Sequence, residues 1–598
     1  FYTAITKITV LDPTVGSGAF LFAALNILEP LYEACINRMA EFVEDLPDDA
    51  PPSQFSDFKI ILSQVNQHPS RSYFIYKTII IHNLYGVDII DEAIEVCKLR
   101  LFLKLVAQID SVKHIEPLPD IDFNIRAGNT LVGFATNDEV GQAVTRTLDF
   151  DNNLGKITNK AEDVQALYDA FLEAQMEEDD STADFKMELR NKLKELNETL
   201  NHYLAGEYGV DVKNKEKYEN WLQTHQPFHW FVEFYGIIEN GGFDVIIGNP
   251  PYIKYSKIIC DYTVIANTYK TELCNNLYAL IYERSLILLK KFGWQGLIIP
   301  LTSMHTNQMA SLQELISFQL SYNSAFCGDT NPSVLFIGAR MQLLISILNK
   351  NNHNDLWNSK YIRFYNKERN ILFQNLPNFE KSERVKEKLI SVPKYVNNLG
   401  KNIINKIFKS ANYKVFSNYF SKDDLNKSYY LTSLSYFPRA FIDPPEFQNE
   451  KSGKSLSSHC KGINLNNPKI RNSFVAIICS TIFYFYWHVF SYGRQLNKRE
   501  VDYFPVDFSS FKSDLLDNLS KGGILLNIDL FENSLIRESF SQRTGVSRQR
   551  IFVPKKSKPI IDKIDKVLAE HYGFTEEELD FIINYDIKYR MGKELNPD

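Results

Sequence analysis

The sequence predicts an α/β protein built on a doubly wound parallel sheet. Apolar runs of strand length alternate with amphipathic stretches of helical spacing over the first 130 residues. Sharp turns separate them, and an aspartate directly follows each of the first two expected strands, at Asp12 and Asp88. Strands that alternate with helices in this way are typical of a parallel sheet covered by helices.

The elements follow one another in a consistent order. The expected strands are short apolar runs at residues 6–11, 84–87, 123–126, 243–247, 295–300, 334–336 and 341–348. The expected helices carry apolar residues at spacings of three and four, and cover residues 19–39, 92–107 and 276–292. Together these elements predict a first domain that spans residues 1–348.

A helical insertion interrupts this domain at about residues 151–225. Apolar residues recur at helical spacing over 185–203, which predicts an amphipathic helix paired with another near 161–176. At the other end of the chain, residues 541–598 are expected to form a helical segment. There Thr575 and Glu578 have the spacing of a capping box before an apolar run.

Composition limits the class of protein. A chain of 598 residues is too long for one core and suggests about three or four units of ordinary domain size. Its seven cysteines include no CxxC pair, so we expect neither a disulfide framework nor a metal site. We find no uninterrupted apolar run of the roughly 18 residues that a membrane span needs. These features favour a cytoplasmic protein with no membrane partner.

Positive charge is concentrated in residues 351–500. This block has 24 Lys and Arg against 11 Asp and Glu, a net charge of +13, whereas the rest of the chain has 42 against 62, a net charge of −20. The block is also rich in Asn, Ser, Tyr and Phe. Such a mixture suits contacts to phosphates and bases, although a solvated lysine-rich domain is the alternative. The concentration of positive charge in one contiguous block favours a nucleic-acid partner.

A loop with two glycines follows the first expected strand. The run DPTVGSG, residues 12–18, opens the helix at 19–39. Gly16 and Gly18 let the backbone approach a ligand at a helix start, which suits a nucleotide or a carboxylate, although a turn that only packs strand on helix has the same composition. Asp88 can accept hydrogen bonds from ribose hydroxyls, or it can cap the following helix. Together, the loop and Asp88 predict a ligand that contains adenosine.

A second motif, Asn249-Pro250-Pro251-Tyr252, ends the buried strand at 243–247. In a parallel sheet this strand end lies at the same edge as Asp12 and Asp88. The Asn249 side-chain oxygen and the Pro250 carbonyl can accept the two hydrogens of an exocyclic amine, and the prolines hold these acceptors rigidly. Tyr252 offers a ring on which an extruded base can stack. A turn that only caps the core is the alternative.

The order of these motifs resembles that of a known family. Asp-Pro-x-x-Gly-x-Gly, a strand-end Asp, Gly-Asn-Thr-Leu and Asn-Pro-Pro-Tyr follow one another as in the gamma-class N6-adenine methyltransferases of DNA. The chain is most similar to the methylase and specificity part of type IIG restriction–modification enzymes and of BREX- and DISARM-type phage-defence methylases. Residues 123–136, 227–252 and 557–592 extend the resemblance over most of the chain.

The resemblance implies a Rossmann-like methyltransferase sheet and S-adenosyl-L-methionine as the cofactor. It also implies that residues 349–540 form a mixed α/β target recognition domain that reads the DNA sequence. The expected cofactor-binding residues are Tyr2, Thr3, Asp12, Pro13, Gly16, Gly18, Asp88 and Asn129. The expected catalytic residues, around the target amine, are Asn249, Pro250, Pro251 and Tyr252. Phe336 is a candidate second wall for base stacking, with a core position beside Leu335 as the alternative. Because Phe1-Tyr2-Thr3 precedes the first strand so closely, we expect a segment to be missing near Ala4.

The implied function is site-specific methylation of N6 of a flipped adenine in double-stranded DNA, without a metal ion, in restriction–modification or phage defence. N4 of cytosine fits the same acceptors. Two alternatives stay open: the modification half of a bifunctional restriction endonuclease–methyltransferase, and a non-catalytic DNA-recognition component. Other defence-system, nuclease or helicase subunits are candidate partners.

Overall fold

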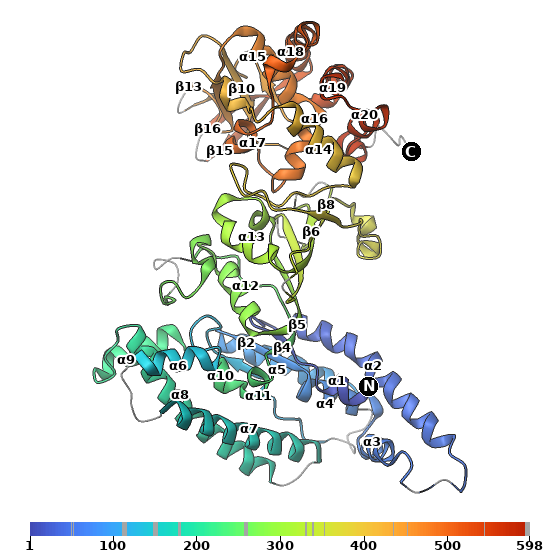
Figure 1. The fold of residues 1–598 in the computed structure, drawn as a ribbon, viewed down its shortest axis with the longest axis vertical. Helices are drawn as coiled ribbons and strands as arrows, with labels where there is room; N and C mark the ends of the chain where they lie inside the picture. Colours follow the sequence, from blue (N-terminus) through green and yellow to red (C-terminus); the bar gives the residue numbers. More distant parts are fainter. Residues whose placement is uncertain are drawn as a thin grey trace. The chain divides into compact units, whose positions relative to one another are not determined.

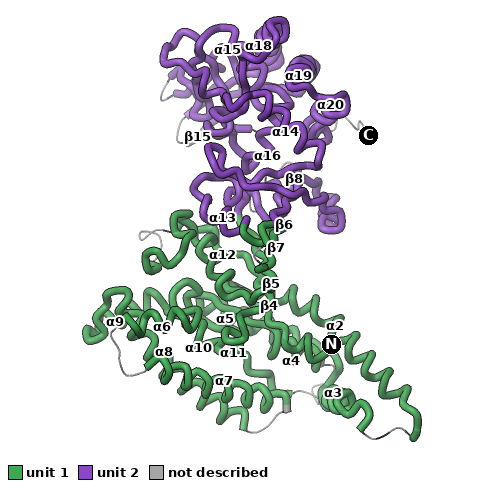
Figure 2. The backbone as a smooth tube through the Cα atoms, viewed as in Figure 1, with its two compact units in different colours: residues 1–299, 318–321, 345–354 green, residues 300–317, 322–344, 355–598 purple. Residues whose placement is uncertain are grey.

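The computed structural model describes residues 1–592 except 50, 52, 110–115, 147–152, 178–180, 256–260, 329–331, 338–339, 352, 435, 451–452 and 543–544. The chain divides into two compact units (Figure 2). Unit 1 comprises residues 1–299, 318–321 and 345–354, and unit 2 comprises residues 300–317, 322–344 and 355–598.

Parallel strands form the centre of unit 1 (Figure 1). They lie in the order β3-β2-β1-β4-β5, with the bounds β1 (Val10–Asp12), β2 (Leu84–Asp88), β3 (Ile125–Ala127), β4 (Phe243–Gly248) and β5 (Leu289–Pro300). Every neighbouring pair in this order is parallel. The carboxyl ends of β1, β2 and β4 therefore lie along one edge of the sheet, where the sequence predicts the ligand.

Apolar helices pack on this sheet. The core contains residues of α2 (Ala19–Glu44), α4 (Arg71–His82) and α5 (Asp91–Val106). Nine consecutive residues of α4, from Tyr73 to Ile81, are buried. An apolar helix with no polar face is expected where protein covers it on all sides.

One described helix, α2, is long and apolar enough by length and composition to cross a membrane, and the bent pair α15 (Pro468–Cys479) and α16 (Thr481–Phe490) also passes that test. The sequence had predicted no run of that length. The two statements differ because Asn26, Glu29 and Glu33 interrupt the apolar run of α2, although its average composition is apolar. In this structure its apolar face is part of the core, with Leu21, Leu25, Tyr32 and Ile36 buried.

Long helices follow β3. Their bounds are α6 (Asn137–Arg146), α7 (Asn153–Glu177), α8 (Thr182–Glu207) and α9 (Lys215–His225). In Figure 1, α7 and α8 run side by side. Leu189, Leu193, Leu196 and Leu200 of α8 face a separate apolar cluster that includes Phe171 of α7. Helix α12 (Leu277–Leu288) then precedes β5.

Unit 2 combines helices with small sheets. Strand β8 (Leu356–Ile362) pairs antiparallel with β9 (Glu380–Ser382). A three-stranded sheet has the order β11-β10-β14, with β10 (Lys427–Leu431), β11 (Ala440–Phe441) and β14 (Cys460–Asn464). A four-stranded sheet has the order β13-β12-β16-β15, with β12 (Phe447–Asn449), β13 (Gly453–Lys454), β15 (Ser534–Ser541) and β16 (Gly545–Phe552). The core between them contains α15, α16, α18 (Ser513–Glu532) and α19 (Lys558–Tyr572).

Several expected elements differ from the structure. Residues Tyr2–Thr6 form a helix, α1, and the first strand is only Val10–Asp12. The Asn83 side chain donates to the carbonyls of Ile5 and Ile8, at 2.8 and 2.7 Å, and this holds the chain out of the sheet before Val10. Residues 334–336 form no strand.

The C-terminal segment also differs from the expectation of a helical segment over 541–598. Near its start it contains the strand β16, which pairs antiparallel with β15 over residues 545–552. Further along, α19, α20 (Glu576–Ile583) and α21 (Ile587–Arg590) are helical as expected. The capping box at the start of α20 is confirmed: the Thr575 N–H donates to the Glu578 carboxylate at 2.8 Å, and the Glu578 N–H donates to the Thr575 hydroxyl at 3.2 Å.

Candidate active site at the carboxyl edge of the sheet

Asp12 ends β1 in a buried position, with 1% of its surface exposed. Its Oδ1 accepts a hydrogen bond from the backbone N–H of Thr14 at 3.0 Å. Burial raises the pKa of this carboxyl to about 7; the Thr14 hydrogen bond opposes the shift and the negative charge of Asp88 adds to it. The site therefore holds an acid whose charge changes near neutral pH.

The two glycines of the loop after β1 have different surroundings. Both have positive φ angles, +49° at Gly16 and +78° at Gly18. A Cβ on Gly18 would lie 2.6 Å from Sγ of Cys97, so Gly18 packs the loop against α5. A Cβ on Gly16 would meet no described atom within 4 Å. Gly16 thus borders the open space in which a ligand would lie.

Asp88 orders this loop. Its Oδ2 accepts the Gly16 N–H at 2.8 Å, and its Oδ1 accepts the Ile90 N–H at 3.0 Å. The carboxylate therefore braces the glycine loop, which the sequence did not predict, and the residue before α5, which resembles the helix-capping alternative. Since each carboxylate oxygen can accept a second hydrogen bond, Asp88 still has capacity for a ligand hydroxyl.

Two buried polar atoms at this edge have no hydrogen-bond partner among the described residues. One is Nδ2 of Asn129, whose Oδ1 accepts the Leu131 N–H at 3.0 Å. The other is Oγ1 of Thr14, a residue that the sequence reasoning missed because it stands at a variable position of its motif. The Thr130 hydroxyl donates to the Pro13 carbonyl and so ties the two loops together. Unpaired buried polar atoms are costly unless a ligand or water satisfies them.

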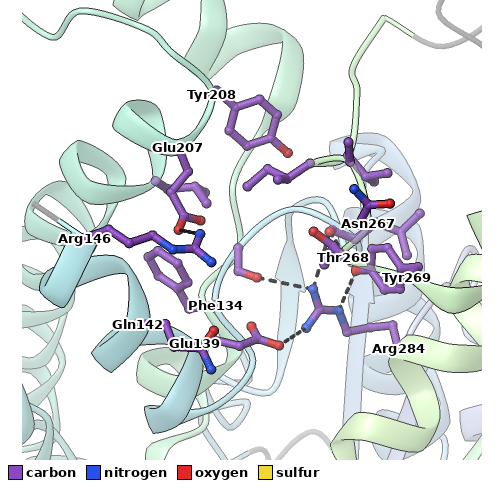
Figure 3. A pocket seen from close by; sticks show the side chains of 16 residues that line it. Phe134, Glu139, Gln142, Arg146, Glu207, Tyr208, Asn267, Thr268, Tyr269 and Arg284 are labelled. Atoms are coloured by element: carbon purple, nitrogen blue, oxygen red, sulfur yellow. Dashed lines mark hydrogen bonds and ion pairs between the residues drawn. The ribbon is translucent and has the colours of Figure 1, made fainter.

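A cavity of about 370 Å³ is lined by Arg284 and by Leu131 and Gly133, which follow Asn129 in the chain (Figure 3). Arg284 projects into it from α12 and is 1% exposed. Its guanidinium donates to the Tyr269 hydroxyl at 2.8 Å and to the carbonyls of Leu131 and Gly133 at 3.5 and 3.4 Å, and it pairs with Glu139 at 3.5 Å. These hydrogen bonds from Arg284 stabilise the loop that follows Asn129.

The sequence reasoning also missed Arg284. The available signal was the polar group Glu283-Arg284-Ser285 within the mostly apolar run LYALIYERSLIL, which forms an almost completely buried helix. A buried guanidinium needs several hydrogen-bond acceptors, and only the folded chain shows which carbonyls supply them.

The Asn-Pro-Pro-Tyr motif follows β4 directly. A Cβ on Gly248 would lie 2.7 Å from Oδ1 of Asp12, so the residue before Asn249 contacts the buried carboxyl. Asn249 is exposed, while Pro250 is buried and Pro251 is partly buried. The sequence placed Asn249 and Asp12 at one edge, and the structure joins them through Gly248.

Tyr252 is linked to Asn249. Its hydroxyl lies 2.5 Å from Oδ1 of Asn249 and 3.0 Å from the carbonyl oxygen of Ile298. Its ring meets the edge of Tyr278, with the centroids 6.1 Å apart. Burial and Tyr278 raise the pKa of the Tyr252 phenol, so it stays protonated at neutral pH. A phenol has one hydrogen for these two acceptors, so it can satisfy Ile298 and leave Asn249 Oδ1 to another donor.

Two expected cofactor-binding residues, Tyr2 and Thr3, lie away from the glycine loop. The Tyr2 ring packs against Tyr32, with centroids 5.6 Å apart, and burial raises its pKa to about 12. Tyr32 is 13 residues into α2, about 20 Å from the start of that helix beside the glycine loop, so the structure does not bring Tyr2 and its neighbour Thr3 to the loop. Phe336 belongs to unit 2 and is 39% exposed, so the alternative of a core position is wrong.

Part of the chain that includes the candidate site matches a known protein family. Residues 82–326 match the model of the Eco57I restriction-modification methylase family. This match covers about two fifths of the chain. The Eco57I-type methylase segment contains Asp88, Asn129, the Asn-Pro-Pro-Tyr motif and Arg284, whereas the glycine loop lies ahead of it.

A relative of the Eco57I-type segment is a protein of Methanocaldococcus jannaschii named as a type II restriction enzyme and methyltransferase. It is 27% identical over 345 residues, which is 50% of this chain and 26% of the relative. The chain thus spans about a quarter of the length of the curated relative it matches.

Similar solved structures include the type IIL restriction–modification enzyme MmeI in complex with DNA, at 10% identity and a TM-score of 0.41, covering 99% of this chain and 74% of that one. Another is a nuclease-deletion mutant of the type ISP enzyme LlaGI with a DNA substrate mimic, at 12% identity and a TM-score of 0.38, covering 90% of this chain and 53% of that one.

Proposed function

We propose that this chain is a site-specific DNA methyltransferase that transfers a methyl group from S-adenosyl-L-methionine to N6 of an adenine flipped out of duplex DNA. The observation that carries the proposal is the placement of Asn249 and Tyr252 directly after Gly248, which contacts the buried Asp12 beside the glycine loop. The Eco57I-type methylase family supports it. Restriction–modification or phage defence, in the cytoplasm, is the proposed setting.

The residues present fit S-adenosyl-L-methionine, which supplies a methyl group on a positively charged sulfur. Gly16 borders open space, and Nδ2 of Asn129 and Oγ1 of Thr14 lack partners among the described residues, as donors and acceptors for a polar ligand should. Asp12, Pro13, Gly16 and Gly18 would hold the cofactor at the end of β1. Asp88 would accept from the ribose hydroxyls, and Asn129 would face the adenine.

The target amine needs two hydrogen-bond acceptors at fixed positions. An exocyclic amine is a weak nucleophile because its lone pair is delocalised into the ring. Asn249 Oδ1 and the Pro250 carbonyl would each accept one amine hydrogen, which frees the lone pair for attack on the methyl carbon. Pro250 and Pro251 fix this turn, so little reorganisation is required.

Tyr252 would serve in two ways. Its ring offers a stacking surface for the flipped base. Its hydroxyl can donate to Ile298 when the base arrives, so that Asn249 Oδ1 becomes available to the amine. N4 of cytosine presents the same two hydrogens, so the choice of adenine rests on the resemblance to N6-adenine methyltransferases.

A second candidate function is the modification half of a larger restriction enzyme. The relative of Methanocaldococcus jannaschii is named for both activities, and this chain spans 26% of it. Nuclease, helicase or other defence-system subunits would then be partners. Cleavage of unmethylated duplex DNA with a divalent cation, by the full natural protein, would support this candidate over methylation alone.

The test is transfer of labelled methyl from S-adenosyl-L-methionine to mixed-sequence duplex DNA, with nucleoside analysis of the product. We expect N6-methyladenine from the wild-type chain and none from Asn249→Ala, while both bind the cofactor in calorimetry. A wild-type chain that binds DNA but not the cofactor would instead indicate a non-catalytic recognition component. Methylation that survives Asn249→Ala would contradict the role of this motif.

A further inference from the structure

The hairpin of β15 and β16 in unit 2 has two distinct faces. Residues paired across it share a face, and successive residues alternate between faces. One face, called here the amide face, combines the pairs Leu535–Ile551, Arg537–Gln549 and Ser539–Ser547 with Phe447 and Asn449 of β12. The other face carries Glu538, Arg548, Arg550 and Phe552, with Gln448 of β12.

The end of the second face that carries Phe552 packs on the core of unit 2. Phe552 is 5% exposed and packs on Phe441 and Phe531, with centroids 4.5 and 5.4 Å apart. Arg550 pairs with Glu446 at 2.7 Å and lies over the Phe531 ring. The amide face therefore points away from this core, and Leu535 on it is 70% exposed.

The amide face is chemically one-sided. Its paired residues named above include an arginine, two amides and two serines, while Glu538 lies on the other face. The Glu450 carboxylate lies beside Gly545, at the turn end of the hairpin. Ser539 and Ser547 are hydrogen bonded to each other across the strands at 3.0 Å. Within the described part of the hairpin, Arg537 forms no ion pair and is exposed. Such a surface matches a polyanion whose base edges offer both donors and acceptors.

We propose that the amide face of the β15–β16 hairpin enters the major groove of the DNA substrate, where Arg537 and Gln549 read adjacent base pairs. This inference rests on the proposed DNA methyltransferase function and assigns part of its sequence specificity. β15 is the edge strand of its four-stranded sheet, so this edge can enter the major groove, which admits two strands side by side. Its eight residues span about 26 Å. Arginine pairs with the O6 and N7 acceptors of guanine, and glutamine with N6 and N7 of adenine.

The structure also extends the expected target recognition domain beyond residue 540. The expected domain, residues 349–540, ends one residue before the end of β15 and excludes β16. The structure pairs β16 with both β15 and β12, so the sheet is complete only when residues 545–552 are included. The three arginines of the two strands lie outside the basic block at 351–500.

The test uses the full chain and a library of duplex oligonucleotides with randomised positions, selected by binding and, separately, by methylation. The variants Arg537→Ala and Gln549→Ala are compared with matched controls on the opposite face, Arg548→Ala and Gln448→Ala. We expect each variant on the amide face to lose preference at one position of the selected sequence, at a guanine for Arg537 and an adenine for Gln549. A loss of about 5- to 100-fold in discrimination is expected from one bidentate contact.

The control variants Arg548→Ala and Gln448→Ala should weaken binding to all DNA sequences by the same factor. The sequence selected from the library should be the same as for the wild-type chain. An unchanged selected sequence in both amide-face variants would overturn the proposal, as would a concentration-dependent dimer that Arg537→Ala abolishes, because the face would then bind a second copy. Failure of the wild-type chain to methylate any oligonucleotide would count against the proposed function, while the binding selection would still report on the hairpin.

Discussion

Gly248 lies against Asp12 so closely that a Cβ on it would stand 2.7 Å from Oδ1 of the carboxyl. The strand that presents Asn249 and the strand that begins the glycine loop are therefore in contact at their carboxyl ends. This contact links the proposed cofactor and target-amine sites, and it leads to the first prediction.

Gly248→Ala should disturb both sites. The added methyl group must displace the Asp12 carboxyl or move β4, so we expect methyl transfer to fall about 100-fold or more, as small displacements of reacting groups do. Gly296→Ala is the matched control, since a Cβ there would meet Ile247 at an ordinary 3.7 Å. Cofactor titration calorimetry and initial rates measure the two effects. Equal rates in both variants would show that the contact is not needed.

Asp12 should make cofactor binding depend on pH. Its pKa is about 7 in the folded protein, against about 3.9 in an unfolded chain, so the folded state favours the protonated form. A cationic cofactor favours the ionised form, and affinity should therefore rise as pH increases from 6 to 8. Asp12→Asn should bind more weakly above pH 7 and lose this dependence. Calorimetry at several pH values checks both.

The raised pKa of Asp12 also predicts how the stability of the ligand-free protein depends on pH. Because the folded pKa is raised, the stabilisation from protonated Asp12 is complete below about pH 4 and is lost as pH rises toward 7. The free energy of unfolding of Asp12→Asn, relative to wild type, should therefore increase across that range. Urea unfolding at pH 5 and pH 7.5 compares the two proteins, and a constant difference would refute the shift.

Two substitutions of Tyr252 distinguish the contribution of its ring from that of its hydroxyl. Tyr252→Phe keeps the ring but removes the hydroxyl that contacts Asn249 and Ile298, and we expect kcat/KM to fall about 10-fold. Tyr252→Ala also removes the stacking surface, which contributes about 1–3 kcal/mol per base, and should cost about 100-fold or more. Steady-state kinetics on one duplex gives both values. If Phe and Ala are equally impaired, the ring does not stack on the base.

Arg284 should contribute to stability through the Asn129 loop. Arg284→Ala removes the donor to the Tyr269 hydroxyl and to the Gly133 carbonyl, while the Leu131 carbonyl keeps the Tyr269 hydroxyl as a donor at 2.9 Å. We expect the free energy of unfolding to fall by about 3 kcal/mol, because a buried ion pair also loses its cation. Arg146→Ala, in the same cavity, removes an exposed pair with Glu207 and should cost less than about 1 kcal/mol (Figure 3). Chemical denaturation compares them, and similar losses would contradict the anchoring role.

The positions of motifs relative to strand ends follow from local sequence. Short apolar runs followed by Asp12, Asp88 and Asn249 indicate parallel strands, and parallel strands bring their carboxyl ends to one edge. The structure has the five strands β1 to β5 where these runs predict them, with shifts of a few residues at the ends. The Thr575 capping box could be predicted because it depends on four consecutive residues.

Contacts between distant segments could not be predicted in this way. The approach of Gly248 to Asp12, the bracing of Gly16 by Asp88 and the carbonyls that surround Arg284 join residues 72 to 236 positions apart. The hairpin of β15 and β16 was missed because its polar alternation gives no strong apolar signal. Sequence by itself determined which residue types stand at the strand ends. The tertiary structure decided which of them touch, because packing of side chains against particular neighbours selects one arrangement among many that share the same local pattern.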